Sequence, residues 1–139
     1  ECSVRKWLFR PGNELVLEDF PVPLSTGIHQ DRSRVLSWKC RGQCVLMIGN
    51  AGFSSLARAA MTPRADVLVI GHHPRDPVDS AAWIRATGAR AVIFTTEHEC
   101  PVPEGTAVYR LPETGAIYLR VEEEGVQIIP WKGMGRRTG

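Results

Sequence analysis

Two groups of side chains in this sequence are of the types that bind metal ions. His72 and His73 follow the apolar run at residues 67–70 and Gly71, which ends that run. The carboxyl end of a buried strand is where α/β proteins place ligand residues, so this pair is one candidate site. The other is the run Glu-His-Glu-Cys at residues 97–100, which contains His98. A metal ion at either place would lower the pKa of a bound water to about 7 and supply hydroxide for hydrolysis.

Each group also has an interpretation without a metal. A His-His pair that lacks further ligands is commonly structural or exposed, and this interpretation of His72 and His73 stays open. In an extended run such as residues 97–100, neighbouring side chains point in opposite directions, so at most two of the four could meet at one ion. We therefore expect residues 97–100 to form a solvated loop.

The sequence lacks the motifs of several other enzyme classes. The phosphate-binding pattern Gly-x4-Gly-Lys-Ser/Thr, the nucleophile pattern Gly-x-Ser-x-Gly and the dinucleotide-binding glycine fingerprint are all absent. Asp66, Asp76 and Asp79 could act as acid–base groups. Each of the three also has an explanation as a helix cap or a strand-end residue, which we prefer.

Apolar segments bounded by Gly, Pro and polar clusters predict the strands that would position these residues. They lie at residues 6–9, 14–18, 34–40, 43–48, 67–70, 91–94, 108–110, 116–121 and 126–129. Arg41 and Gly42 separate the third and fourth segments, which gives the clearest hairpin signal. The uninterrupted apolar runs at 67–70 and 91–94 suit strands that are buried on both faces.

Two helices are expected between these strands. The first covers residues 54–61, with Ser54 as its N-cap. The second has Asp76 as its N-cap and Pro77 at its first position, and it runs to about Thr87, where Gly88 stops it. The alternation of strands and helices predicts the α/β class, with a mixed sheet and flanking helices.

Size and composition predict one domain over residues 1–139, because 139 residues with 43% hydrophobic content suffice for one core. Residues 131–139 are expected to be a flexible tail. The net charge of +2 favours no partner class, and Arg136-Arg137 is only a two-residue basic run near the end of the sequence. No apolar run reaches the roughly 18 to 20 residues of a membrane span. Because the chain starts with Glu1 and shows no signal peptide, we expect it to be part of a longer protein.

The four cysteines lie at positions 2, 40, 44 and 100. Cys40 and Cys44 flank a short turn, so a disulfide between them is one interpretation and two reduced thiols in neighbouring strands is the other, which we favour. A zinc ribbon would need a second closely spaced pair, and Cys2 and Cys100 are isolated in the sequence.

The order of these segments resembles a known family. Met-Ile-Gly-Asn-Ala-Gly at residues 47–52 follows the hairpin, and Ala-Asp-Val-Leu-Val-Ile-Gly-His-His follows at residues 65–73. A capped helix, a strand at residues 89–95 and Gly-Ala-Ile-Tyr-Leu at residues 115–119 complete the series. This series is similar to the later half of the metallo-β-lactamase-like domain of ComEC-type competence proteins. The resemblance implies a metallo-β-lactamase-like half-sandwich.

The resemblance also implies which residues would bind zinc or manganese. His72 and His73 match the strand-end histidines of the family, but Pro74 stands where the family has Gly. Asn50 takes the place of the family's bridging Asp, and a neutral amide is a poor bridge between two cations. The family's first ligand cluster, His-x-His-x-Asp-His, is missing from the chain. We therefore expect no cofactor in this chain and a role for Asn50 in a tight turn.

For function, the resemblance implies a module of a DNA-uptake protein that moves single-stranded DNA across the inner membrane during transformation. It would be a soluble domain of that membrane protein, on a side that stays open, and without hydrolase activity by itself. Its expected partners are single-stranded DNA through the parent protein, the missing half of the domain and a second copy, because a half-sandwich leaves an apolar sheet face uncovered.

Two alternatives remain. The chain could belong to an intact metal-dependent phosphodiesterase whose first metal motif lies outside it. It could also be an unrelated α/β interaction domain with a chance His-His pair.

Overall fold

The computed structural model describes residues 3–10, 13–20, 35–49, 53, 56, 64–71 and 79–134. Asn50, His72 and His73 lie outside these residues, as do Ser54, Asp76 and Pro77. The predictions that rest on those six residues therefore stay predictions, except where a neighbouring described residue bears on them.

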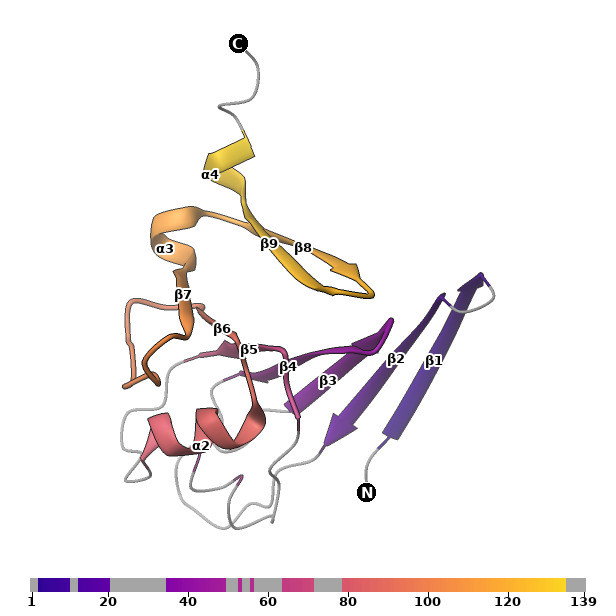
Figure 1. Cartoon of the computed structure of the whole chain (residues 1–139), viewed down its shortest axis with the longest axis horizontal. Helices are drawn as coiled ribbons and strands as arrows, with labels where there is room; N and C mark the ends of the chain where they lie inside the picture. Colours follow the sequence, from indigo (N-terminus) through magenta and orange to yellow (C-terminus); the bar gives the residue numbers. More distant parts are fainter. Residues whose placement is uncertain are drawn as a thin grey trace.

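One sheet contains seven strands in the order β1-β2-β3-β4-β5-β6-β7 (Figure 1). The strands are β1 Ser3–Arg10, β2 Asn13–Phe20, β3 Val35–Cys40, β4 Gln43–Gly49, β5 Val67–Ile70, β6 Ala91–Phe94 and β7 Ala107–Arg110. Pairs from β1 to β4 are antiparallel and pairs from β4 to β7 are parallel. The predicted α/β class with a mixed sheet is confirmed.

The β3–β4 hairpin is closed by a two-residue loop. Arg41 and Gly42 have φ values of 50° and 76°, the left-handed conformation that tight hairpin loops require at both positions. Cys40 pairs with Gln43, and Cys44 pairs with Lys39. Because side chains alternate between faces along a strand, Cys40 and Cys44 point to opposite faces of the sheet. No disulfide joins these two residues.

Helix α2, Ser80–Thr87, covers one face of the sheet (Figure 1). Its N-cap is Asp79, whose carboxylate accepts a hydrogen bond from the N–H of Ala82 at 3.1 Å. The prediction of Asp76 as the cap was wrong, because this bond starts the helix three residues later. Gly88 ends the helix in the left-handed conformation, with φ 79°, as predicted.

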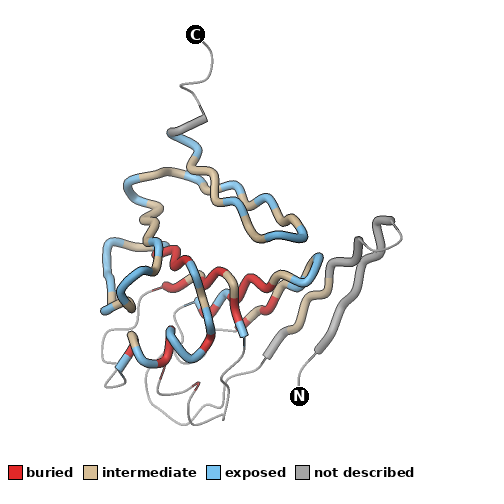
Figure 2. Tube along the Cα trace, viewed as in Figure 1, coloured by how far each residue is buried: buried red, intermediate tan, exposed pale blue. Residues whose placement is uncertain are grey.

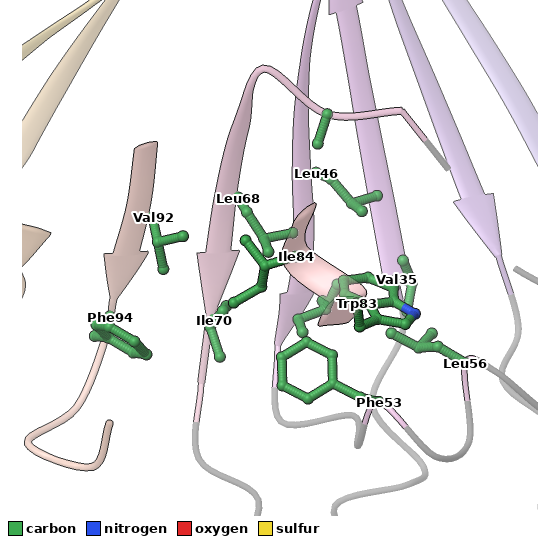
Figure 3. Packing of buried hydrophobic residues seen from close by; sticks show 12 residues of the cluster. Val35, Leu46, Phe53, Leu56, Leu68, Ile70, Trp83, Ile84, Val92 and Phe94 are labelled. Carbon is green, nitrogen blue, oxygen red and sulfur yellow. The ribbon is translucent and has the colours of Figure 1, made fainter. Parts of the chain in front are cut away.

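The main core lies between α2 and this face of the sheet (Figure 3). Trp83 and Ile84 of α2 pack there, together with Phe53 and Leu56, which are also in helical conformation. The predicted N-cap Ser54 lies outside the described residues, so that prediction stays a prediction. The strand residues of the core are Val35, Leu46, Ile48, Leu68, Ile70, Val92 and Phe94. As Figure 2 shows, the buried residues are concentrated in the central strands and in α2.

A separate hairpin covers the other face of the sheet. After the short helix α3, Leu111–Thr114, strands β8, Ile117–Glu122, and β9, Gly125–Pro130, form a two-stranded sheet. Their inward residues Ile117, Leu119, Val126 and Ile128 pack against a second cluster that contains Val45, Val67, Ala91 and Ile93. The face expected to be uncovered is thus partly covered by the chain itself (Figure 1). Within the described residues, Met47 on this face keeps 37% of its surface exposed.

The predicted tail begins with structure. Residues Trp131–Met134 form the short helix α4, and the N–H of Trp131 donates to the carbonyl of Ala116 at 2.7 Å. That bond attaches the end of β9 to the start of β8.

Candidate functional site

Three parallel strand ends meet at one edge of the sheet. The N–H of Gly71, after β5, donates to the carbonyl of Gly49 at the end of β4 at 2.6 Å. Both the N–H and the hydroxyl of Thr95, after β6, donate to the carbonyl of Ile70, at 2.9 and 3.3 Å. The carboxyl edge of parallel strands is the usual position of ligand residues in α/β proteins. We call this edge, defined by Gly49, Gly71 and Thr95, the carboxyl edge.

Asn50 follows Gly49, and His72 and His73 follow Gly71, so the sequence continues from the carboxyl edge into the predicted ligands. Within the described part of the chain, no three His, Cys, Asp or Glu side chains form a group that could hold a metal ion. The polar groups that the described residues place at this edge are backbone amides and the Thr95 hydroxyl, already hydrogen-bonded to one another. The zinc or manganese site stays a prediction, because Asn50, His72 and His73 lie outside the described residues.

The run at residues 97–100 does not converge on one point. Glu97 and His98 are exposed, and the backbone N–H of His98 donates to the hydroxyl of Thr96 at 3.2 Å. Glu99 forms an ion pair with Arg110 of β7. Cys100 packs against the main core. The four side chains therefore serve different surroundings, as expected of a solvated loop, and His98 has no place in a described ligand cluster.

Asp66 and Asp79 have structural roles. Asp79 caps α2. Asp66 Oδ2 accepts a hydrogen bond from the N–H of Cys44 at 2.7 Å, and its Oδ1 accepts one from Arg64 at 3.3 Å. Asp66 thus has the strand-end role expected from sequence, whereas Asp79 takes the capping role that the sequence assigned to Asp76.

Cys44 is a buried thiol beside a buried hydroxyl. Its Sγ lies 3.3 Å from the Oγ of Ser37, and both residues face a cavity of about 490 Å³. Burial raises the pKa of the Cys44 thiol above its ordinary value, and the hydrogen bond with Ser37 opposes this only in part. Because the thiolate is the reactive form of cysteine, this side chain is a poor nucleophile at neutral pH.

A second recess lies at the opposite, amino edge of the parallel strands. It has a volume of about 340 Å³ and lies between β9 on one side and the first residues of β5 and β6 on the other. Its charged lining residues are Asp66, Arg90, Glu122 and Glu124. We call it the β9 groove. No sequence signal indicated it, because it exists only through the way the β8–β9 hairpin crosses the sheet.

No helix in the described residues is long and apolar enough to cross a membrane. Comparison of the chain with protein-family models, with curated proteins and with solved structures found no match.

Proposed function

We propose that this chain is a metallo-β-lactamase-like module of a ComEC-like DNA-uptake protein and that it has no hydrolase activity by itself. The order of its sequence motifs supports this proposal. So does the arrangement of its layers, with α2 on one face of a mixed sheet and a β-hairpin on the other. In the arrangement that the resemblance implies, helices lie on the outer face of each half, as α2 does here, and the β8–β9 hairpin lies on the face that the other half would approach.

The observation that carries the proposal is the junction at the carboxyl edge. Gly49 and Gly71 directly precede the positions at which the family places its metal ligands, and a 2.6 Å hydrogen bond joins them. A site built from two segments that are distant in sequence needs such a junction. The third segment, after β6, joins the same edge through Thr95.

The donor types at this edge argue against hydrolysis by the chain alone. A pair of divalent ions needs a carboxylate to offset their mutual repulsion, and Asn50 supplies a neutral amide instead. The family's first ligand cluster is absent from the sequence. The module would then contribute a scaffold to the parent protein, through which single-stranded DNA is the expected partner.

The first test is metal binding and cleavage by the purified chain. We expect no stoichiometric zinc or manganese after incubation and gel filtration, measured by plasma mass spectrometry, and no cleavage of single-stranded DNA. The double variant H72A/H73A should behave like the wild type, and His98→Ala is the matched control outside the carboxyl edge. Bound metal that H72A/H73A loses and His98→Ala retains, together with DNA cleavage, would overturn the non-hydrolytic assignment.

The DNA-uptake assignment has a separate test. The coding sequence that flanks these residues in the parent gene should encode one membrane channel region. An upstream His-x-His-x-Asp-His would favour the alternative of an intact metal-dependent phosphodiesterase. A parent protein without a channel region would overturn the DNA-uptake assignment and favour an α/β interaction domain.

A further inference from the structure

We propose that the β9 groove binds an extended, basic peptide segment, which adds to β9 as a third strand of the small sheet. The groove lies at the amino edge of the parallel strands, opposite the carboxyl edge. The inference is therefore independent of the proposed function.

The backbone of β9 presents unused hydrogen-bonding groups to the groove. The two-residue turn Glu123-Glu124 makes Glu122 and Gly125 the closing pair of the hairpin. Hydrogen-bonded pairs alternate along an antiparallel ladder. The bond from the Trp131 N–H to the Ala116 carbonyl fixes the same alternation at the other end. The backbone N–H and C=O groups of Gly125 and Gln127 therefore point toward β8.

By the same alternation, Val126 and Ile128 direct their N–H and C=O groups away from β8. Both residues line the groove. Among the residues that the structure describes, no strand pairs with this edge of β9. Unpaired strand edges are templates for another chain, because the added strand supplies the missing hydrogen bonds.

The described residues also hold the groove in place. Val67 and Ala91 lie at its base and are only 2% and 6% exposed, because the β8–β9 hairpin packs against their cluster. The side-chain amide of Gln43 donates to the carbonyl of Glu123 at 3.0 Å and thus attaches the hairpin tip to the β3–β4 hairpin. This attachment supports the groove as a preformed site.

The charges around the groove select the occupant. Glu122 and Glu124 line it and form no ion pair with any described residue, and Asp66 adds a third carboxylate that Arg64 already neutralises in part. Arg90 is the one cation of the described lining. The net negative charge favours a peptide with lysine or arginine side chains over an acidic one.

The experiment uses three blocked pentapeptides with the whole chain. The first is Val-Lys-Val-Lys-Val, the second replaces both lysines with glutamate, and the third is the lysine peptide with N-methylated valines. Heteronuclear NMR titration should show amide shifts at Val126 and Ile128 with the lysine peptide. We expect binding about tenfold weaker for the glutamate peptide, from two partly exposed charge pairs. N-methylation should weaken binding as well, because it removes donors of the added strand.

Variants test the charge part of the inference. The double variant E122Q/E124Q should lose most of the preference for lysine over glutamate, whereas Glu113→Gln, an exposed glutamate of α3, should keep it. Equal affinity for the two unmethylated peptides, or shifts that avoid β9, would overturn the proposal. So would a dimer in light scattering that involves β9 and excludes the peptide, because a second copy would then be the occupant.

Discussion

Asp66 and Cys44 are joined by two hydrogen bonds in opposite directions. The Cys44 N–H donates to the Asp66 carboxylate at 2.7 Å, and the Asp66 N–H donates to the Cys44 carbonyl at 2.8 Å. Cys44 lies at the start of β4, and Asp66 directly precedes β5. The pair thereby sets the start of the first parallel strand pair, at the place where the sheet changes from antiparallel to parallel.

The first prediction concerns this pair. Asp66→Ala should lower the free energy of unfolding by about 1–3 kcal/mol, because it leaves the part-buried Cys44 N–H without its acceptor. Equilibrium urea denaturation followed by circular dichroism measures the change. The control is Arg64→Ala, which removes only the exposed partner of Asp66 and should cost less than about 1 kcal/mol. Equal costs for the two variants would contradict the assigned role of the hydrogen bond to Cys44.

Trp83 has a buried indole N–H without a hydrogen-bond partner among the described residues, and its ring centroid lies 4.8 Å from that of Phe53. Trp83→Phe removes the unsatisfied donor and keeps an aromatic ring in the core. The relieved desolvation should offset much of the lost packing, so the unfolding free energy should change by less than about 1 kcal/mol. Trp83→Ala should cost about 3–5 kcal/mol, because it leaves a cavity. Similar losses of unfolding free energy for both variants, measured by thermal and urea unfolding, would contradict a free-energy cost of the unsatisfied indole N–H.

The Cys44 thiol predicts a pH dependence of stability. Burial raises its pKa in the folded state above the ordinary value of 9.0, so the unfolded chain releases this proton first as the pH rises. The stabilisation is complete below about pH 9 and is lost as the pH rises through the folded-state pKa. Unfolding free energies of the wild type and of Cys44→Ala between pH 7 and pH 10.5 should therefore diverge only above about pH 9. Parallel curves would contradict the raised pKa.

Arg41 is the only non-glycine residue with positive φ in the described part of the chain. Asn tolerates this conformation better than Arg, and Asn-Gly is a favoured pair in two-residue hairpin loops. Arg41→Asn should raise the unfolding free energy by about 0.5–1 kcal/mol, whereas Arg41→Val should lower it. Denaturation midpoints of the two variants measure this ordering, and the reverse order would contradict the loop assignment.

Local patterns predicted the hairpin with strands at 34–40 and 43–48, within one residue of the observed bounds, and the buried strands at 67–70 and 91–94, because apolar runs and turn residues act over short distances. They placed the end of α2 correctly and its start wrongly. Asp76 and Asp79 are both carboxylates that could cap a helix, and it is Asp79 whose side chain accepts the hydrogen bond from the Ala82 N–H.

The candidate sites were less predictable. Strand alternation correctly indicated that residues 97–100 would not converge, but the partner of Glu99 is a residue of β7 that no local pattern connects with it.

 The ion pair between Glu99 and Arg110 joins residues that are 11 positions apart in sequence. The β9 groove depends on contacts over still longer separations, because the tip of the β8–β9 hairpin reaches Gln43, 80 positions earlier. Such contacts follow from how whole elements pack, so only the structure reveals them.

The change from antiparallel to parallel pairing at β4 also implies an order in which the strand pairs form during folding. Trp38 and Val45, which pair across the β3–β4 hairpin, are only 7 positions apart in sequence, whereas the parallel partners Val45 and Val67 are 22 positions apart. Closing the longer loop costs more chain entropy, and parallel pairs form slowly for this reason. We expect the β3–β4 hairpin to form early and to serve as the template on which β5, β6 and β7 assemble in turn. Refolding should therefore be slowed most by substitutions that weaken this hairpin, while substitutions in β7 should mainly speed unfolding.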